Sequence, residues 1–117
     1  MDILATNAYR AAVAQAAAIG GTVPRATEIA FGVGTTPASV EDTGIEGEVV
    51  RRALSLVEAS GVELRVAGTL LGQASGDAVI TEAGIFAEGG LLMGRRVFAP
   101  KQLEPESSID FEMFFQF

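Results

Sequence analysis

Residues 109–117 alternate between apolar and polar side chains more regularly than any other segment of the chain. Every second position is apolar: Ile109, Phe111, Met113, Phe115 and Phe117. Asp110, Glu112 and Gln116 stand between them, and Phe114 is the one exception. Because successive side chains of a β-strand point to opposite faces of the sheet, this spacing predicts a strand with one buried face.

The middle of the chain carries further strand patterns. Residues 28–33 are rich in β-branched and aromatic side chains and lead into a polar, turn-rich loop. Residues 48–59 suit either a helix or a strand. The turn at 59–61 and the alternation over 62–66 favour the strand, so we predict a β-hairpin here.

A second hairpin is predicted from residues 78–86 and 91–98, joined by the turn at 87–90. We expect residues 70–76 to form a flexible connection, and the prolines between Pro100 and Pro105 to end strand pairing. Short turns and the absence of a strand–helix–strand rhythm predict a mainly β protein. We expect an antiparallel β-sandwich or sheet of about six strands with one N-terminal α-helix.

The predicted helix covers residues 3–19, which contain strong helix formers and neither glycine nor proline. Asp2 is available as its N-cap, and Gly20-Gly21 is a natural stop. Its narrow apolar stripe includes Tyr9, Val13 and Ala16. The helix either packs on its own domain or forms an arm that docks on another subunit. We therefore divide the chain into a helical arm, 1–21, and a β domain, 22–117.

Composition excludes several function classes. The 117 residues suffice for one domain, and Lys plus Arg number 8 against 15 Asp plus Glu, giving a formal charge of −7. This balance argues against nucleic acid or an anionic membrane as the main partner. The absence of His and Cys removes histidine acid–base catalysis, cysteine nucleophiles, the usual zinc sites and disulfides. We expect no enzyme, cofactor or metal site.

Targeting signals are weak as well. No apolar run reaches the length of about 18 residues that a membrane-spanning helix needs. Asp2 stands where the positive region of a signal peptide belongs. We therefore expect a protein that stays in the cytoplasm until it is assembled or released.

Two functional alternatives use residues of the loops and strands. A hydrolase would use carboxylates, and Asp42, Glu48 and Glu82 are the ones to test, although strand spacing favours solvated charges for most acidic residues. A small host-surface or carbohydrate-binding module would use the loops 34–44 and 72–78. The absence of Trp and the single Tyr disfavour it, because sugar sites use aromatic platforms.

Two arginine doublets, Arg51-Arg52 and Arg95-Arg96, lie within predicted strands, so one member of each points to each face. One arginine of each doublet is expected to meet an acidic strand across the sheet. Alternatively, Arg51, Arg95 and Arg96 hold a carboxylate of another subunit, for which arginine is well suited. Together with the helix stripe they form the candidate assembly interface: Tyr9, Val13, Ala16, Arg51, Arg95 and Arg96.

Two stretches together resemble phage tail-collar and tail-fibre-type domains. Residues 29–37 (IAFGVGTTP), then Glu41-Asp42-Thr43 and an acidic residue before a strand, are similar to the opening of that family. Residues 80–86 follow its pattern I-x-E-x-G-I-F, and residues 90–100 follow G-x-L-x-x-R-x-x-F-x-P. The resemblance covers about residues 26–117. It departs at 42–47, where two glycines loosen a segment that is usually firmer, and it explains the Ala-rich helix least.

The resemblance implies a non-enzymatic structural component of a phage or phage-like tail, collar or baseplate. Family members commonly assemble as oligomers with other virion tail proteins. We therefore expect a homo-oligomer, with a trimer favoured, that is located in the virion after assembly in the host cytoplasm.

Overall fold

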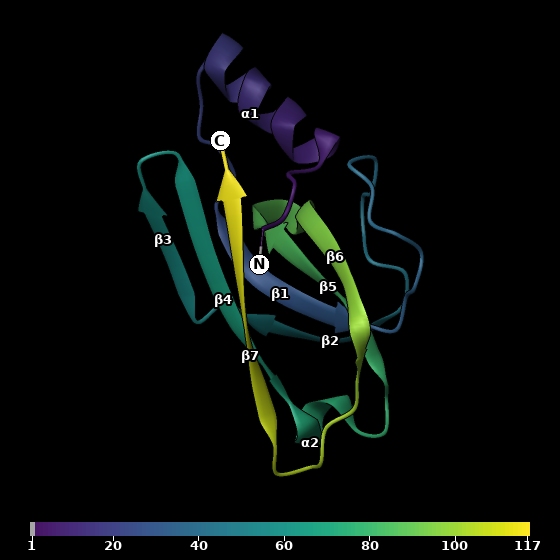
Figure 1. The fold of residues 1–117 in the computed structure, drawn as a ribbon. Helices are drawn as coiled ribbons and strands as arrows, with labels where there is room; N and C mark the ends of the chain where they lie inside the picture. Colours follow the sequence, from purple (N-terminus) through teal and green to yellow (C-terminus); the bar gives the residue numbers. More distant parts are fainter. Residues whose placement is uncertain (1) are drawn as a thin grey trace.

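Seven strands form two antiparallel sheets in the computed structural model, which describes residues 2–117 (Figure 1). The elements follow in this order: α1 (Asn7–Ile19), β1 (Ala26–Gly32), β2 (Glu48–Ala53), β3 (Leu56–Ser60), β4 (Glu63–Leu71), α2 (Gly72–Ser75), β5 (Ile80–Ala87), the 3-10 turn η1 (Glu88–Gly90), β6 (Leu91–Lys101) and β7 (Ser108–Gln116). The first sheet has the order β2-β1-β5-β6 and the second β3-β4-β7. The predicted mainly β, antiparallel fold with one N-terminal helix is confirmed.

The seventh strand arises because the predicted strand 48–59 divides between the two sheets. The backbone N–H of Leu54 donates to the carbonyl of Thr27 in the first sheet, at 3.0 Å. The next N–H, that of Ser55, donates to the carbonyl of Ala67 in the second sheet, at 2.8 Å. The chain thus turns a corner between β2 and β3 and joins the sheets along one side. Both predicted hairpins, β3–β4 and β5–β6, are confirmed.

Residues 2–6 join the sheets along the opposite side. The N–H of Ile3 donates to the carbonyl of Phe114 in β7, at 3.0 Å, and the N–H of Thr6 donates to the carbonyl of Met93 in β6, at 2.8 Å. The Ile3 side chain is buried in the core. This short extended segment therefore closes the seam between the edge strands β6 and β7 (Figure 1).

The predicted start of the helix is wrong, because residues 2–6 are extended and bind to the two sheets. The helix α1 begins at Asn7, and Thr6 rather than Asp2 is its N-cap, accepting a hydrogen bond from the N–H of Tyr9 at 3.1 Å. The hydroxyl of Thr6 also donates to the carbonyl of Leu92 at 2.6 Å. Hydrogen bonds to both sheets and burial of Ile3 outweigh the helix propensity of residues 3–5. The predicted stop at Gly20 is confirmed.

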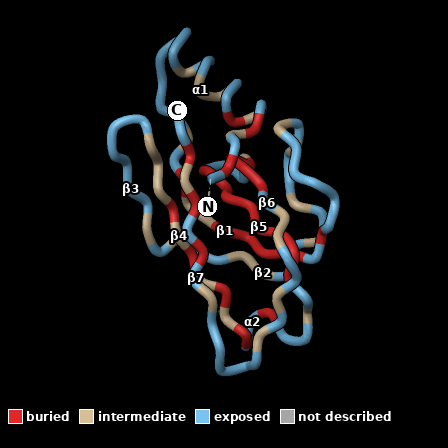
Figure 2. The backbone as a smooth tube through the Cα atoms, viewed as in Figure 1, coloured by how far each residue is buried: buried red, intermediate tan, exposed pale blue. Residues whose placement is uncertain are grey.

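The core lies between the two sheets and is built largely from alternate residues of the strands other than the exposed β3 (Figure 2). In β7 the residues Phe111, Met113 and Phe115 are buried, as their spacing predicts. Phe117 is 56% exposed because it follows the last residue of the strand. Among residues 2–117, no helix has the length and apolar character required to cross a membrane.

The connection expected at 70–76 is more ordered than predicted. Leu70 and Leu71 complete β4, and the following residues form the short helix α2, in which Gly72 and Ser75 are buried. A side chain at Gly72 would overlap with the backbone carbonyl of Glu104, so the glycine allows the β6–β7 connection to approach closely. Strand pairing continues one residue past Pro100, to Lys101, on the edge strand β6.

Candidate functional site

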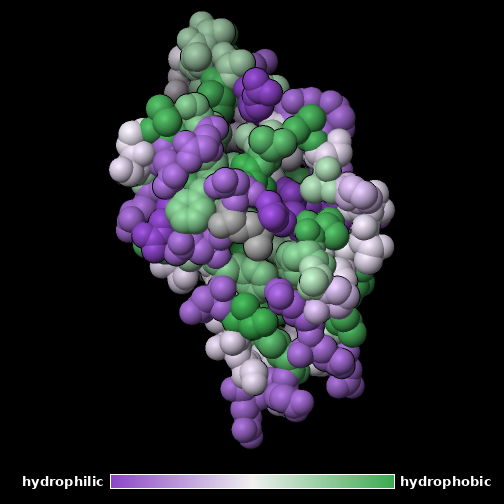
Figure 3. Space-filling view, in the orientation of Figure 1, coloured by the Kyte–Doolittle hydropathy of each residue, from purple (hydrophilic) through white to green (hydrophobic). Residues whose placement is uncertain are grey.

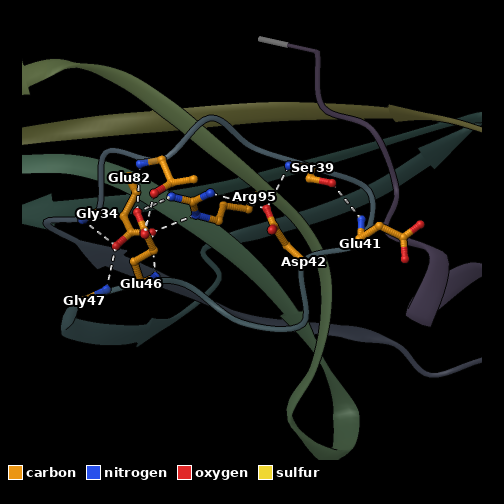
Figure 4. Close-up of polar contacts among 9 residues, drawn as sticks. Gly34, Ser39, Glu41, Asp42, Glu46, Gly47, Glu82 and Arg95 are labelled. Carbon is orange, nitrogen blue, oxygen red and sulfur yellow. Dashed lines mark hydrogen bonds and ion pairs between the residues drawn. The ribbon is translucent and has the colours of Figure 1, made fainter.

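A long loop, residues 33–47, covers the outer face of the four-stranded sheet. It joins β1 to β2 and carries Ile45, which packs on Ala30, Phe86 and Leu92. These residues form a second, smaller apolar cluster apart from the main core. Beneath the loop lies a polar group that we call the Glu82 cluster: Glu82, Arg95, Asp42 and Glu46 (Figure 4).

Glu82 is fully buried on β5 and accepts hydrogen bonds from the loop backbone. The N–H groups of Gly34 and Gly47 donate to its Oε2 at 2.7 and 2.8 Å, and the N–H of Glu46 donates to its Oε1 at 2.9 Å. Arg95 on β6 donates from Nε to Oε1 at 2.8 Å. One carboxylate therefore fastens both ends of the loop to the sheet (Figure 4).

Arg95 is 5% exposed and uses its remaining donors on two further carboxylates. Its Nη1 lies 3.3 Å from Asp42 Oδ2, and its Nη2 lies 3.2 Å from Glu46 Oε1. Glu46 also accepts hydrogen bonds from the N–H and the hydroxyl of Thr36, at 2.8 and 2.6 Å. The guanidinium is thus surrounded by acceptors of its own chain, as a buried cation requires.

Two glycines give the Glu82 carboxylate its space. A Cβ atom on Gly34 would lie 2.5 Å from Glu82 Oε2, and one on Gly32 would lie 2.6 Å from the same oxygen. Real side chains do not tolerate such distances. The glycines of the segment IAFGVGTTP therefore serve close approach of the backbone to a carboxylate.

The environment shifts the pKa values of two carboxyl groups in the cluster. Burial opposes ionisation of Glu82 most strongly. Hydrogen bonds from Arg95 and from the N–H groups of Glu46, Gly47 and Gly34 together outweigh this effect and hold its pKa below the ordinary value. The pKa of Glu46 is lowered chiefly by the hydrogen bond from the Thr36 hydroxyl.

These shifts predict a loss of stability in acid. A carboxyl group whose pKa is lower in the folded than in the unfolded protein stabilises the fold above its unfolded pKa of about 4.3. That contribution disappears as the pH falls through the folded pKa. We expect the urea midpoint to fall between about pH 5 and about pH 3, and Glu82→Gln to show a smaller fall. Equal falls in the two proteins would contradict this role of Glu82.

The arrangement is chemically saturated. Both carboxylate oxygens of Glu82 and all three side-chain nitrogens of Arg95 have hydrogen-bond partners within the chain. Glu82 is fully buried, so a substrate would not reach its carboxylate. Among residues 2–117 no group of acidic side chains is arranged to hold a metal ion. Glu48, the third carboxylate of the hydrolase alternative, instead pairs with Arg51 at 2.7 Å. The cluster is built to hold a loop.

The arginine doublets behave as their strand positions predict. Arg95 meets Glu82 of the neighbouring strand β5, and Arg51 lies 3.5 Å from Glu28 of β1, so one member of each doublet pairs across the sheet. Arg51 also lies over the Phe86 ring, 3.9 Å from its centroid. Arg95 is occupied within its own chain. Arg96 is exposed and donates from Nη1 to the carbonyl of Asp2 at 2.6 Å.

The helix residues of the candidate interface lie against the chain's own β fold. Tyr9 is buried, its hydroxyl donates to the carbonyl of Pro24 at 3.2 Å, and burial raises its pKa. Val13 is half-buried and packs on the main core, and Ala16 is half-buried. The structure thus brings the helix stripe onto the β fold, and it does not join this stripe to Arg51 or Arg95.

The loops of the carbohydrate-binding alternative border two separate hollows. Residues of the loop 34–44 line one of about 420 Å³, together with residues 2–4 and 95–97. Residues of the loop 72–78 line another of about 430 Å³, together with residues 102–105. No aromatic side chain is among the described residues that line either hollow. The carbohydrate-binding alternative stays a prediction, and neither hollow offers the aromatic surface on which sugars commonly stack.

Sequence reasoning predicted that one arginine of each doublet pairs across the sheet, but it did not identify Glu82 as the partner of Arg95 or predict that Glu82 is buried. One signal was available, because Glu82 is the only charged residue in the run 78–86, AVITEAGIF. A lone charge inside an otherwise apolar strand indicates either a solvent-facing position or a paired, buried one. Asp42 and Glu46 could not be assigned, because their contacts depend on how the loop folds back.

Comparison of the chain with family models, with curated proteins and with solved structures gives no match.

Proposed function

We propose that this protein is a non-enzymatic structural component of a phage tail, collar or baseplate, or of a phage-like particle. It is proposed to act as a homo-oligomer, with a trimer favoured, together with other tail proteins. The observation that carries the proposal is the placement of the residues on which the family resemblance depends. Several of them meet in or around the Glu82 cluster.

The two motif stretches come together in space. Gly34 of the first stretch donates its N–H to Glu82 of the second, and Arg95, further along the second stretch, donates to the same carboxylate. Gly84 approaches Ile45 of the loop, where a Cβ would lie 2.6 Å from its methyl group, and Phe86 lies in the cluster with Leu92. The pattern therefore describes a way of fastening a loop to a sheet. A motif that fastens a loop to a sheet supports a structural role for the protein more than an enzymatic one.

The helix α1 supports an assembly role. Its first turns pack on the β fold through Tyr9 and Val13, whereas Ala14, Ala17 and Ala18 are exposed and Ile19 is 81% exposed. In Figure 1 the helix extends beyond the sheets at the end where the C-terminus also lies. A helix surface of small side chains allows another helix to approach closely. The exposed part of α1 is therefore available to a neighbouring subunit.

Substitutions on the exposed side of α1 test this role. Ala11 and Ala18 are both exposed and lie opposite Tyr9 on the helix. We expect the unmodified chain to have a mass of several subunits by light scattering behind a sizing column. Ala11→Glu with Ala18→Glu should shift it to the 12.1 kDa monomer, because charge is placed in a close contact. Deletion of the arm is a poorer test, because residues 2–6 close the seam between the sheets.

The matched control is Thr43→Glu with Ser60→Glu, which adds the same charge at exposed positions outside the helix. This variant should keep the mass of the unmodified chain. An oligomer that survives the helix substitutions would remove α1 from the interface. A monomer at every concentration of the unmodified chain would count against the assembly proposal itself.

A further inference from the structure

Beside the helix lies a surface groove made of two hollows that meet at Leu4 and Val40. One has a volume of about 420 Å³ and runs along residues 35–40 and β6, and the other, of about 560 Å³, runs under α1 to Phe117. Leu4 is 78% exposed and Phe117 is 56% exposed, so large apolar side chains stand open to solvent here. We call this surface the arm groove. Exposed apolar surface of this kind commonly marks an interaction site.

Two arginines of the arm groove have no carboxylate partner among residues 2–117. Arg10 makes no ion pair or side-chain hydrogen bond, and Arg96 uses one nitrogen on the backbone carbonyl of Asp2. Among the described residues that line the groove, Asp2 is the only acidic one. In a chain with a formal charge of −7, this makes the groove a local site of positive charge beside apolar surface. Its chemistry suits an acidic segment that also carries an apolar group.

The end of the molecule away from α1 presents such a segment. The β6–β7 connection contains a turn, Glu104–Ser107, in which the N–H of Ser107 donates to the carbonyl of Glu104 at 2.9 Å. Glu104, Pro105 and Glu106 are exposed, and neither glutamate has an ion-pair partner in the described chain. We call this turn the acidic tip. Figure 3 shows hydrophilic side chains gathered at the lower end of the molecule, where Figure 1 places the β6–β7 connection.

The acidic tip is held in place by its surroundings. The N–H of Gly72 donates to the carbonyl of Ser107 at 2.8 Å, and the glycine lets the backbone at Glu104 pack directly on α2. Proline in the turn restricts the backbone further. A segment that is already ordered loses little conformational entropy when it binds. The tip therefore has the rigidity and the charge of a ligand for the arm groove.

We propose that the acidic tip of one copy docks into the arm groove of a second copy, so that subunits associate head to tail. Glu104 and Glu106 would face Arg10 and Arg96, with Pro105 against the apolar side chains between them. The tip lies at one end of a molecule 47 Å long, and the groove lies away from it, between α1 and the middle of the molecule, so each copy offers one of each. Such heterologous contacts form a ring when the rotation closes and a filament when it does not. The inference rests on the proposed assembly function and gives it a specific contact.

A charge exchange tests the contact with the full chain. The groove variant carries Arg10→Glu with Arg96→Glu, and the tip variant carries Glu104→Arg with Glu106→Arg. Alone, each variant places like charges at the contact, so each should be monomeric by light scattering while the unmodified chain is larger. Mixed in equal amounts, the two variants present a basic tip to an acidic groove and an acidic tip to a basic groove. The mixture should therefore regain a mass above that of the monomer, and because the two variants must alternate, its closed rings contain an even number of subunits.

Two controls complete the experiment. Arg52→Glu with Arg25→Glu makes the same change in net charge on exposed arginines outside the arm groove, and it should leave the mass unchanged. Circular dichroism of each variant verifies that the fold is kept. Recovery of mass in the mixture alone, lost again at high salt, supports the contact. If the unmodified chain is oligomeric and both variants keep its mass, the head-to-tail contact is wrong while the assembly proposal stands. A monomeric unmodified chain overturns both.

Discussion

Replacing Glu82 by alanine is expected to lower the free energy of unfolding by about 3–5 kcal/mol. The substitution leaves the buried Arg95 guanidinium without its nearest carboxylate. It also removes the acceptor of three backbone N–H groups, those of Gly34, Glu46 and Gly47. A buried group that loses its partner bears the full cost of having been removed from water. Urea unfolding monitored by circular dichroism measures the difference.

An exposed ion pair of the same chemistry is the control. Glu112 on β7 accepts from Arg65 on β4 at 2.8 Å, the same distance as in the Glu82–Arg95 pair. Both side chains of this control pair are more than 40% exposed, so water replaces the contact when it is lost. Glu112→Ala should therefore change the urea midpoint little. If the two variants lose equal stability, the buried Glu82 cluster stabilises the fold no more than an exposed ion pair does, and other contacts hold the loop.

Phe115→Ala should cost about 3–5 kcal/mol of unfolding free energy, because the ring is fully buried between the sheets and its removal leaves a cavity. Phe117 provides a matched control two residues further along, because it is the same residue type and its ring lies only 6.0 Å from that of Phe115. With Phe117 56% exposed, Phe117→Ala should cost less than about 1 kcal/mol. Thermal or urea unfolding of both variants gives the comparison. Equal costs would mean that β7 does not end where the structure places its end.

The strand pattern of β7 could be predicted because its information is local. Alternation over residues 109–117 follows from one face meeting the core and one face meeting water, and the burial of Phe111, Met113 and Phe115 agrees. The same reasoning gave both hairpins, since a short turn and two alternating segments lie next to each other in the chain. These elements depend little on distant partners.

Distant partners decide two features that the sequence did not predict: the late start of the helix and the change of sheet within residues 48–59. Residues 3–5 have the composition of a helix, yet backbone hydrogen bonds to Phe114 and Met93, more than 80 positions away, hold the flanking segment extended. Residues 48–59 are strand throughout most of their length, but the change of sheet between Leu54 and Ser55 depends on Thr27 and Ala67. The local sequence pattern does not indicate any of these distant partners.

The candidate site was only partly within reach of the sequence. Pairing of Arg95 and of Arg51 across their sheet followed from the strand positions of the doublets. The third and fourth members, Asp42 and Glu46, come from a loop whose path is set by hydrogen bonds to Glu82. A pattern of residue types does not predict how a loop folds back over a sheet. The sequence therefore shows that Glu82 is charged, but not that the loop buries it.

The most direct test of the proposed role is quantitative mass spectrometry of phage or phage-like particles purified from the organism that produces this chain. The proposal predicts that the chain purifies with the particles at a fixed number of copies per tail, and that antibody labelling in electron microscopy places it on the tail. A chain that is abundant in the lysate but absent from the purified particles would contradict the proposal.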